Sequence, residues 1–240
     1  MSPKFFIKAM SLALITFSFG AHAAISLSGT RLVFAEGKKE ETLVVRNDGK
    51  DIVVQSWIES EGEADLPFAI TPPLVRVGAK QQQLLRVLFS GSSLPSDRES
   101  VFWLSIQEIP QSAGEENTLQ LAVRQRIKVF YRPKGLSGTA GAAPEQLEWR
   151  LLNTSDGQQL QIKNPTPYYT TLVDLVLFGV KENKVTDARM LSPGETVTLP
   201  MNKVIGSKHR LDFGSINDYG GRDLFTVDVT EGQSAKAKGL

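Results

Sequence analysis

The stretch at residues 117–133 most constrains what this chain can fold into. Its first half alternates between apolar and polar or small side chains, and the apolar positions are Leu119, Leu121 and Val123. A period of two is typical of a β-strand. The second half is apolar and aromatic apart from Lys128, and no glycine or proline interrupts the run before its end. The pattern predicts one strand of roughly 55 Å, far longer than the usual five or six residues, so we expect it to serve two environments.

Shorter segments of the same kind recur along the chain, separated by turn signals such as Asn-Asp-Gly-Lys at 47–50 and Ser-Pro-Gly at 192–194. Their spacing of roughly eight to twelve residues is typical of β-sandwiches, and no amphipathic helix is evident. The segment 137–144 is uncharged and rich in glycine and alanine, which suits a linker. We therefore expect an all-β chain with one sandwich at 24–136, a second at 145–240, and a polar tail, 233–240, that frays.

Residues 1–23 have the form of a secretory signal peptide. Lys4 and Lys8 make a basic start, a short apolar core follows, and Ala-His-Ala at 21–23 is a cleavage site. A membrane anchor is the alternative, but the apolar core is too short for one. Removing two lysines and no acid changes the formal net charge from +1 to −1, so neither nucleic acid nor a membrane surface is an expected partner.

The chain contains no cysteine, so an exported protein of this length must be held together by packed cores alone. Export to a compartment where disulfides are allowed but unused fits the bacterial periplasm. No further stretch approaches the length of a membrane-spanning helix, and stable membrane insertion is not expected.

Catalytic and metal-binding residues are scarce. The chain after the leader has one histidine, His209, with no nucleophile motif near it, and it cannot supply a histidine- or thiolate-rich metal site. Acidic pairs such as Glu59/Glu61 and Glu115/Glu116 fall in loops or at strand ends, where solvated carboxylates are the simpler interpretation. Gly220-Gly221 indicates a turn, since no phosphate-loop pattern accompanies it. We predict no enzyme, cofactor or metal, which leaves binding.

Two cations stand out as candidate binding residues. Arg31 ends the first expected strand, beside a hydrophobic patch, and Lys128 lies inside an apolar strand. Each can be explained as a solvent-facing or snorkelling side chain, whereas a carboxylate site would need the two to converge. The apolar positions of the long strand are similarly open: they either face their own core or are lent to another protein from a strand edge.

Nine short motifs occur in a fixed order along the chain: Ile25-Ser26-Leu27, Thr30-Arg31-Leu32-Val33-Phe34, Thr71-Pro72-Pro73-Leu74, Asp97-Arg98-Glu99-Ser100, Glu108-Ile109-Pro110, Ile127-Lys128-Val129-Phe130-Tyr131-Arg132-Pro133, Asn164-Pro165-Thr166-Pro167-Tyr168-Tyr169, Leu191-Ser192-Pro193 and Ile216-Asn217-Asp218-Tyr219-Gly220-Gly221. Each is weak alone. The ordered set resembles the periplasmic pilus chaperones of the chaperone–usher pathway over essentially the whole mature chain.

The resemblance implies two immunoglobulin-like β-sandwich domains in an L-shaped arrangement with an interdomain cleft. Within the cleft, the residues matching the family's anchor for a subunit's C-terminal carboxylate are Arg31 and Lys128. The residues matching its groove-filling donor strand are Leu119, Leu121 and Val123. An interdomain charge network would fall on Glu99, Arg132 and Asp218.

The chain departs from many relatives at Ser28-Gly29, where they carry Asp-Arg, and it lacks the second-domain disulfide of some members. Its loop at 109–119 is short, similar to the branch that assembles rod-like adhesive pili. One point stays open in the long strand: its donor positions have the opposite parity to Lys128. Either a bulge lies between residues 124 and 127, or the two halves use opposite faces of the sheet.

The leading hypothesis is a periplasmic, ATP-independent chaperone that captures pilus or fimbrial subunits by donor-strand complementation and delivers them to an outer-membrane usher. Without a client, its exposed strand could be capped by self-association. The alternatives are a structural pilus subunit, which would have one domain and a donor segment at its mature N-terminus, and a glycan-acting hydrolase using two carboxylates. Hydrolysis of glycans would indicate the hydrolase, whereas stoichiometric co-elution with a fimbrial subunit would indicate the chaperone.

Overall fold

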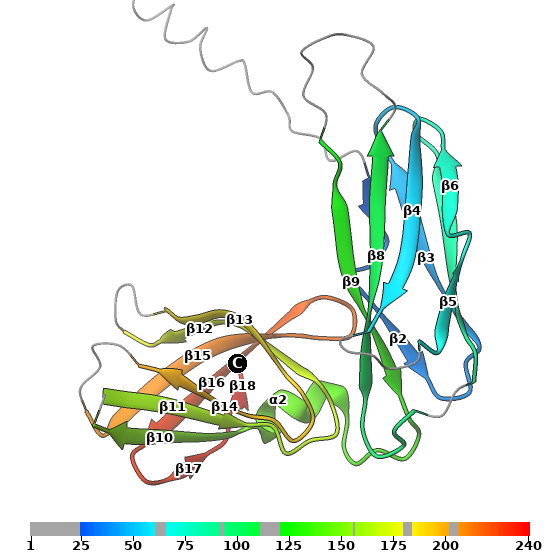
Figure 1. Cartoon of the computed structure of the whole chain (residues 1–240). Helices are drawn as coiled ribbons and strands as arrows, with labels where there is room; N and C mark the ends of the chain where they lie inside the picture. The colour runs from blue at the N-terminus through cyan, green and yellow to red at the C-terminus, as the bar shows by residue number, and fades with distance from the viewer. Residues whose placement is uncertain are drawn as a thin grey trace, which may run out of the picture.

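The computed structural model describes residues 25–60, 66–91, 94–110, 121–155, 157–179, 184–201 and 206–240. The predictions for the leader at 1–23, for Leu119, for Glu61 and for the pair Glu115/Glu116 lie outside the described residues. Two β-sandwiches meet at an angle and form an L (Figure 1). The predicted fold class, an all-β chain of two immunoglobulin-like sandwiches, is confirmed.

Two sheets form the first sandwich. One has the order β1 (Ile25–Leu27), β3 (Glu40–Asn47), β7 (Gln82–Phe89), β5 (Phe68–Thr71). The other has the order β2 (Arg31–Ala35), β9 (Arg124–Arg132), β8 (Ser100–Pro110), β4 (Ile52–Glu59), β6 (Leu74–Val77). Neighbouring strands are antiparallel except β2 and β9, which are parallel.

The first core lies between these sheets because alternate residues of each strand point inward. Phe68 lies at its centre, with ring centroids 4.9 Å from Phe34 and 5.0 Å from Phe102, both edge to face. The turn predicted at 47–50 is present. Buried Asn47 donates its side-chain amide to the carbonyls of Lys50, Val77 and Gly78, which closes the turn against the next hairpin.

The long strand is shorter than predicted. Its ladder begins at Arg124, and the described residues before it, 121–123, are not in a strand. The amide of Glu108 still bonds the carbonyl of Val123 at 3.0 Å, but β8 ends at Pro110, which has no N–H to continue the ladder. The β8–β9 register runs without a shift from Gln107–Arg124 to Ser100–Tyr131, so no bulge lies in this part of β9.

Parity along β9 is therefore regular. Ile127, Val129 and Tyr131 face the core, whereas Lys128 and the other even-numbered residues point away from it. A bulge at 124–127 is therefore excluded, and the described donor positions, Leu121 and Val123, come before the ladder rather than within it.

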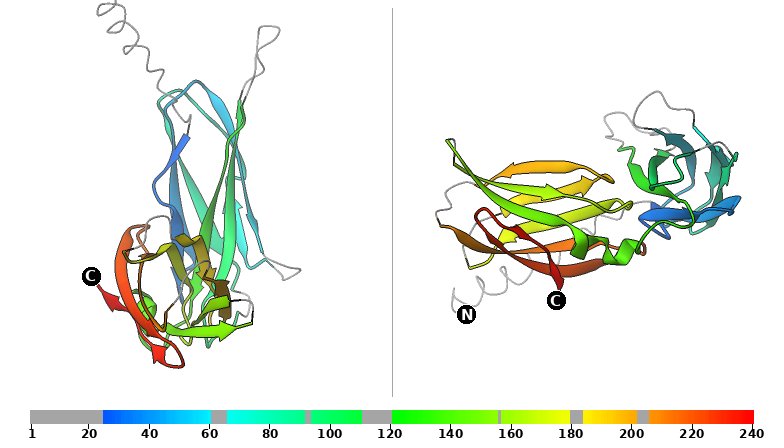
Figure 2. Two further views of the ribbon diagram at one scale, coloured as in Figure 1. Left: turned by 90° about the vertical axis from the view of Figure 1, so that its left-hand side faces the viewer. Right: turned by 90° about the horizontal axis from the view of Figure 1, so that it is seen from below.

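The second sandwich also has two sheets. One has the order β14 (Thr196–Pro200), β11 (Gly157–Lys163), β10 (Glu148–Thr154), β17 (Ser234–Ala235). The other has the order β13 (Lys184–Leu191), β12 (Thr170–Leu177), β15 (Lys208–Ile216), β16 (Arg222–Thr230), β18 (Lys238–Gly239). The right-hand view of Figure 2 shows these two layers. The second core lies between the two layers and contains an aromatic cluster in which Phe213 packs against Trp149 and Phe225.

One expectation is wrong. The C-terminal tail does not fray, because β17 and β18 pair with β10 and β16 and Ala237 is buried between them. The segment expected to be a linker, 137–144, contains a 3-10 turn, η2 (Ala140–Ala142), and the start of a short helix, α2 (Ala143–Gln146), at the junction of the sandwiches (Figures 1 and 2). Thr139 caps the turn, and Pro144 sits in the first helical turn, where proline is tolerated. No helix of the described residues is long and apolar enough to span a membrane.

Candidate functional site: a cationic cleft between the sandwiches

Arg31 and Lys128 lie side by side where the two sandwiches meet. The parallel register of β2 and β9 pairs them directly, so both side chains leave the same face of the sheet. That face is turned toward the second sandwich. Arg31 Nη1 donates to the carbonyl of Ile216 at 3.0 Å, and Lys128 Nζ lies 3.5 Å from Thr171 Oγ1. Two cations 97 positions apart in the sequence are thus brought to one place by the fold.

Aromatic rings support both cations. Arg31 lies 5.8 Å over the Phe130 ring, and Lys128 Nζ 5.5 Å over the Trp103 ring. Burial lowers the pKa of Arg31, while the negative charges of Asp218 and Glu99 act against that shift. An arginine with a modestly lowered pKa stays fully charged at neutral pH. Its buried Nε has no hydrogen-bond partner among the described residues, so Arg31 retains capacity to bind an anion.

Glu99, Arg132 and Asp218 join the two sandwiches by charge. Arg132 donates Nε to Glu99 at 2.6 Å, and its two terminal nitrogens bond the Asp218 carboxylate at 2.7 and 2.8 Å. The second oxygen of Glu99 accepts from the backbone N–H of Tyr169 at 2.9 Å. Arg132 makes two hydrogen bonds to Asp218 of the second sandwich and one to Glu99 of the first. Because a bidentate pair is planar, it fixes the relative orientation of the two groups as well as their distance.

Burial shapes the electrostatics of this network. It raises the pKa of the Glu99 carboxyl, whose side chain is 2% exposed, while the charge of Arg132 and the Tyr169 amide oppose the increase. For Arg132, burial lowers the pKa, but the Asp218 hydrogen bonds and the charge of Glu99 outweigh it and raise the pKa overall.

Asp218 is positioned by the turn that the sequence indicated at Gly220-Gly221. Asn217 Oδ1 accepts from the amides of Tyr219 and Gly221, which closes the turn. Gly220 has φ +84°, and a Cβ there would lie 2.4 Å from Thr30 Oγ1, so glycine is required both by the conformation and by contact with the first sandwich.

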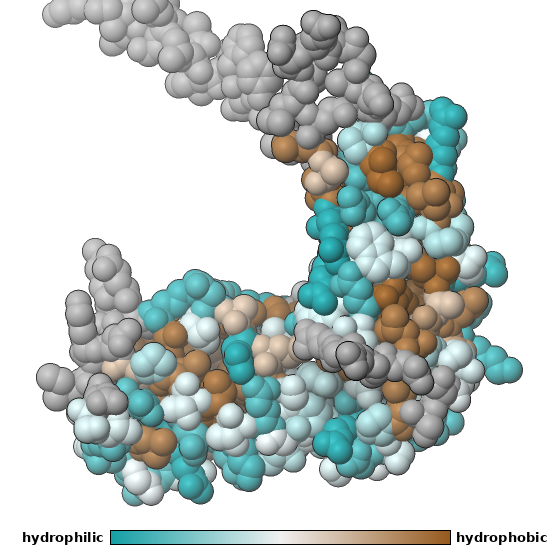
Figure 3. Space-filling view, viewed as in Figure 1, coloured by the Kyte–Doolittle hydropathy of each residue, from teal (hydrophilic) through white to brown (hydrophobic). Residues whose placement is uncertain are grey.

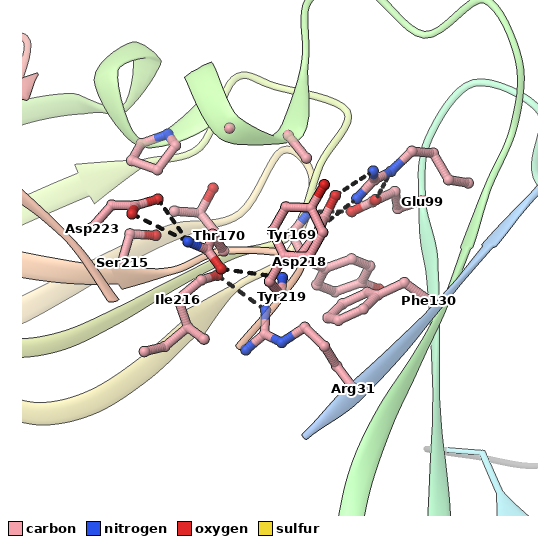
Figure 4. A pocket seen from close by; sticks show the side chains of 15 residues that line it. Arg31, Glu99, Phe130, Tyr169, Thr170, Ser215, Ile216, Asp218, Tyr219 and Asp223 are labelled. Atoms are coloured by element: carbon pink, nitrogen blue, oxygen red, sulfur yellow. Dashed lines mark hydrogen bonds and ion pairs between the residues drawn. The ribbon is translucent and has the colours of Figure 1, made fainter. Parts of the chain in front are cut away.

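A cavity of about 330 Å³ lies beside these groups and is lined from both sandwiches, including Arg31, Phe130, Arg132, Tyr169, Ser215 and Asp218. Figure 4 shows Arg31 and Glu99 entering from the first sandwich and Ser215 and Ile216 from β15 of the second. Lys128 does not line this cavity; it is partly buried beside it, paired with Arg31 on the adjacent strand. The cleft can therefore offer two cations and an aromatic wall to one anionic group.

The described donor positions lie beyond the other end of β9. Leu121 is 73% exposed and Val123 is 41% exposed, so neither packs into its own core. In Figure 3 an apolar patch lies above a hydrophilic band on the side of the first sandwich that faces the second. An exposed apolar segment therefore precedes β9, and the charged cleft lies toward the other end of that strand.

Sequence reasoning missed a second set of charges on this face. Arg124 and Arg126 stack over Trp57 and Trp103, and Glu59, interpreted from the sequence as a solvated carboxylate, pairs with both arginines. The signal was present as basic residues at every second position from Arg124 to Lys128. Among the parts of the chain that are described, no group of acidic or histidine side chains could hold a metal ion.

Comparison with known proteins places this architecture in one class, the two-domain pilus-assembly chaperones. Residues 24–137 match the family described as "Pili and flagellar-assembly chaperone, PapD N-terminal domain", and residues 142–225 match "Pili assembly chaperone PapD, C-terminal domain". The chain belongs to the PapD family of pilus-assembly chaperones, which is not a family of enzymes.

Individual relatives agree. The probable fimbrial chaperone YadV of Escherichia coli K12 is 34% identical over 222 residues, covering 86% of this chain and 90% of YadV, and FocC of Escherichia coli is 38% identical over 209 residues, covering 83% and 87%. The YadV crystal structure superposes with a TM-score of 0.72, covering 86% of this chain and all of that one. The SafB chaperone of Salmonella enterica, solved with the SafA pilin, is 26% identical with a TM-score of 0.68, covering 91% of this chain and 97% of that one.

Proposed function

We propose that this chain is a periplasmic, ATP-independent chaperone that binds fimbrial subunits in its cleft by donating a strand and anchoring the subunit's C-terminal carboxylate. The observation that carries the proposal is the side-by-side placement of Arg31 and Lys128 at the cleft, while the exposed residues Leu121 and Val123 come just before the far end of β9. The SafB–SafA complex, in a relative of the same fold, supports a pilin as the partner.

The anchor works by charge-assisted hydrogen bonding. A carboxylate leaving water needs strong donors, and each bond to a charged donor contributes about 1.5–3 kcal/mol. Arg31 and Lys128 supply two such donors from adjacent strands, held in place by Phe130 and Trp103. Because the carboxylate is the last group of the subunit chain, fixing it also fixes the register of the strand that precedes it.

Strand donation would complete the subunit's unfinished sandwich. An apolar groove with two open strand edges is prone to aggregate, and an added strand covers both groove and edges. We assign the groove-filling side chains to Leu121 and Val123, together with Leu119. Each buried side chain of this size contributes about 1.5–3 kcal/mol before ordering costs.

The interdomain network of Glu99, Arg132 and Asp218 holds the angle at which both sandwiches face the bound subunit. We further propose cleavage of residues 1–23, domains at 24–136 and 145–240 joined by 137–144, residence in the periplasm, and delivery of the subunit to an outer-membrane usher. The family match over both halves of the chain disfavours the one-domain pilus subunit and the hydrolase.

The anchor is tested with Arg31→Ala and Lys128→Ala, using tagged chaperone purified from the periplasm and mass spectrometry of what co-purifies. Loss of one charge-assisted bond predicts roughly tenfold or greater loss of bound subunit. Arg98→Ala, at an exposed arginine, is the matched control. Circular dichroism establishes that each variant is folded. If both anchor variants retain subunit at the level of the control, the anchoring role is wrong.

A further inference from the structure

Two arginines on the cleft-facing surface of the first sandwich, Arg124 and Arg126, are not used by the proposed anchor. Arg124 lies 4.8 Å over the Trp57 ring, and Arg126 lies 4.2 Å over the Trp103 ring. We refer to these four residues as the Arg–Trp band. The face of an indole ring attracts a guanidinium electrostatically, and stacking on the ring restricts the motion of the arginine side chain. The hydrophilic band of Figure 3 follows this side of the first sandwich.

Polar contacts fix the band further. Arg124 donates to Ser105 Oγ at 2.8 and 3.1 Å and to Glu59 at 2.6 Å, while Arg126 Nε lies 3.3 Å from the other Glu59 oxygen. The side chains of Arg124 and Arg126 remain 43% and 40% exposed. Each guanidinium carries five N–H donors, so both arginines can donate to a further carboxylate. Because their side chains are already held in place, little conformational entropy is lost on binding.

The band borders an open strand edge. On one side of β9 the ladder with β8 is continuous from Arg124, whereas β2 covers the other side only at 128–132. Within the described residues no strand pairs with that second edge at 124–127. A strand added there would place alternate side chains beside Arg124 and Arg126 on the same face. Opposite charges are favoured directly across a strand pair, and like charges are disfavoured.

We propose that the Arg–Trp band selects subunits whose added strand carries acidic side chains beside Arg124 and Arg126. This inference rests on the proposed function, because the anchored carboxylate sets the alignment. With the subunit's C-terminus beside Lys128, its last strand runs parallel to β9. The side chains beside Arg126 and Arg124 then belong to residues about two and four positions before the one beside Lys128.

The test uses two synthetic octapeptides with free C-terminal carboxylates, one alternating valine with glutamate and the other alternating valine with lysine. Fluorescence anisotropy measures their binding to the mature chain. We expect the glutamate peptide to bind at least about tenfold more tightly than the lysine peptide, and the ratio to shrink at high salt. Arg124→Gln combined with Arg126→Gln should bring the ratio to about one.

Two controls separate this inference from the anchor. Arg86→Gln combined with Arg150→Gln removes two exposed arginines elsewhere, on β7 and β10, and should keep the wild-type ratio. Arg31→Ala should weaken both peptides and preserve their ratio, since it removes the carboxylate anchor alone. An Arg31→Ala variant that binds both peptides as wild type does would overturn the anchor, and with it the alignment assumed for the band, even if the wild-type ratio favours glutamate. Undetectable binding of the glutamate peptide to wild type, a wild-type ratio near one, or a ratio unchanged in the Arg124/Arg126 double variant would overturn the band.

Discussion

At the residue scale, Glu59, which pairs with both arginines of the Arg–Trp band, shows how neighbouring groups change the pKa of a carboxyl. The hydrogen bond from Trp57 Nε1 to Glu59 Oε1, at 2.5 Å, together with the charges of Arg124 and Arg126, lowers the pKa of the Glu59 carboxyl below its ordinary value. A carboxyl whose pKa is depressed by folding stabilises the folded state above its ordinary pKa. That contribution is lost as pH falls through the folded-state pKa.

Trp57→Phe tests this account, because phenylalanine keeps an aromatic ring under Arg124, though a smaller one, and removes the N–H donor. We expect the pKa of Glu59, followed by carboxyl NMR in a pH titration, to be below its ordinary value in wild type and to rise in the variant. Glu59→Gln should be less stable than wild type at neutral pH, and this difference should shrink as melting is repeated at pH values falling through the lowered pKa of Glu59. A wild-type Glu59 that titrates normally would contradict the account.

At the scale of elements, the exposed end that precedes β9 predicts a separation of stability from capture. Leu121→Glu changes a side chain that is 73% exposed, so the melting temperature should hardly move. Capture of the subunit should weaken by about tenfold to a hundredfold, since the lost apolar burial is about 1.5–3 kcal/mol. Leu74→Glu, at another exposed leucine on β6, is the control in the same co-purification assay. Equal capture by the two variants would exclude Leu121 from the groove.

The same strand shows how far sequence reasoning reaches. Alternation predicted a strand here, and the apolar run around Lys128 marked that residue as unusual, because both signals are local. It overestimated the ladder, since pairing depends on where β8 stops, at Pro110. The Arg–Trp band depends on the register between β4, β8 and β9, which no single segment encodes. The ordered C-terminal tail likewise depends on its pairing with β10 and β16, distant in the sequence.

At the scale of the whole molecule, we expect the angle of the L to depend on a small set of contacts at the junction of the sandwiches. Beyond the three charges, the backbone amide of Glu99 bonds the carbonyl of Pro167 in the second sandwich at 2.9 Å, and Tyr168 Oη donates to the carbonyl of Gly138 in the connecting segment at 3.0 Å. Each sandwich has its own buried core, so the cores do not determine the angle. The network at Arg132 is the group best placed to do so, because it alone joins carboxylates of both sandwiches among the ion pairs between described residues.

Arg132→Ala should therefore loosen the angle without unfolding either sandwich. It leaves Glu99 buried without its cation, and breaking a fully buried pair costs about 3–5 kcal/mol, with less expected here because Arg132 is 23% exposed. The chain has no cysteine, so spin labels at Arg86→Cys and Arg150→Cys, one in each sandwich, report a single distance by pulsed electron resonance. We expect a narrow distribution in the otherwise wild-type chain and a broad one with Arg132→Ala, while Arg98→Ala stays narrow. Equal widths in all three would mean that the remaining backbone and aromatic contacts, rather than the charges, set the cleft.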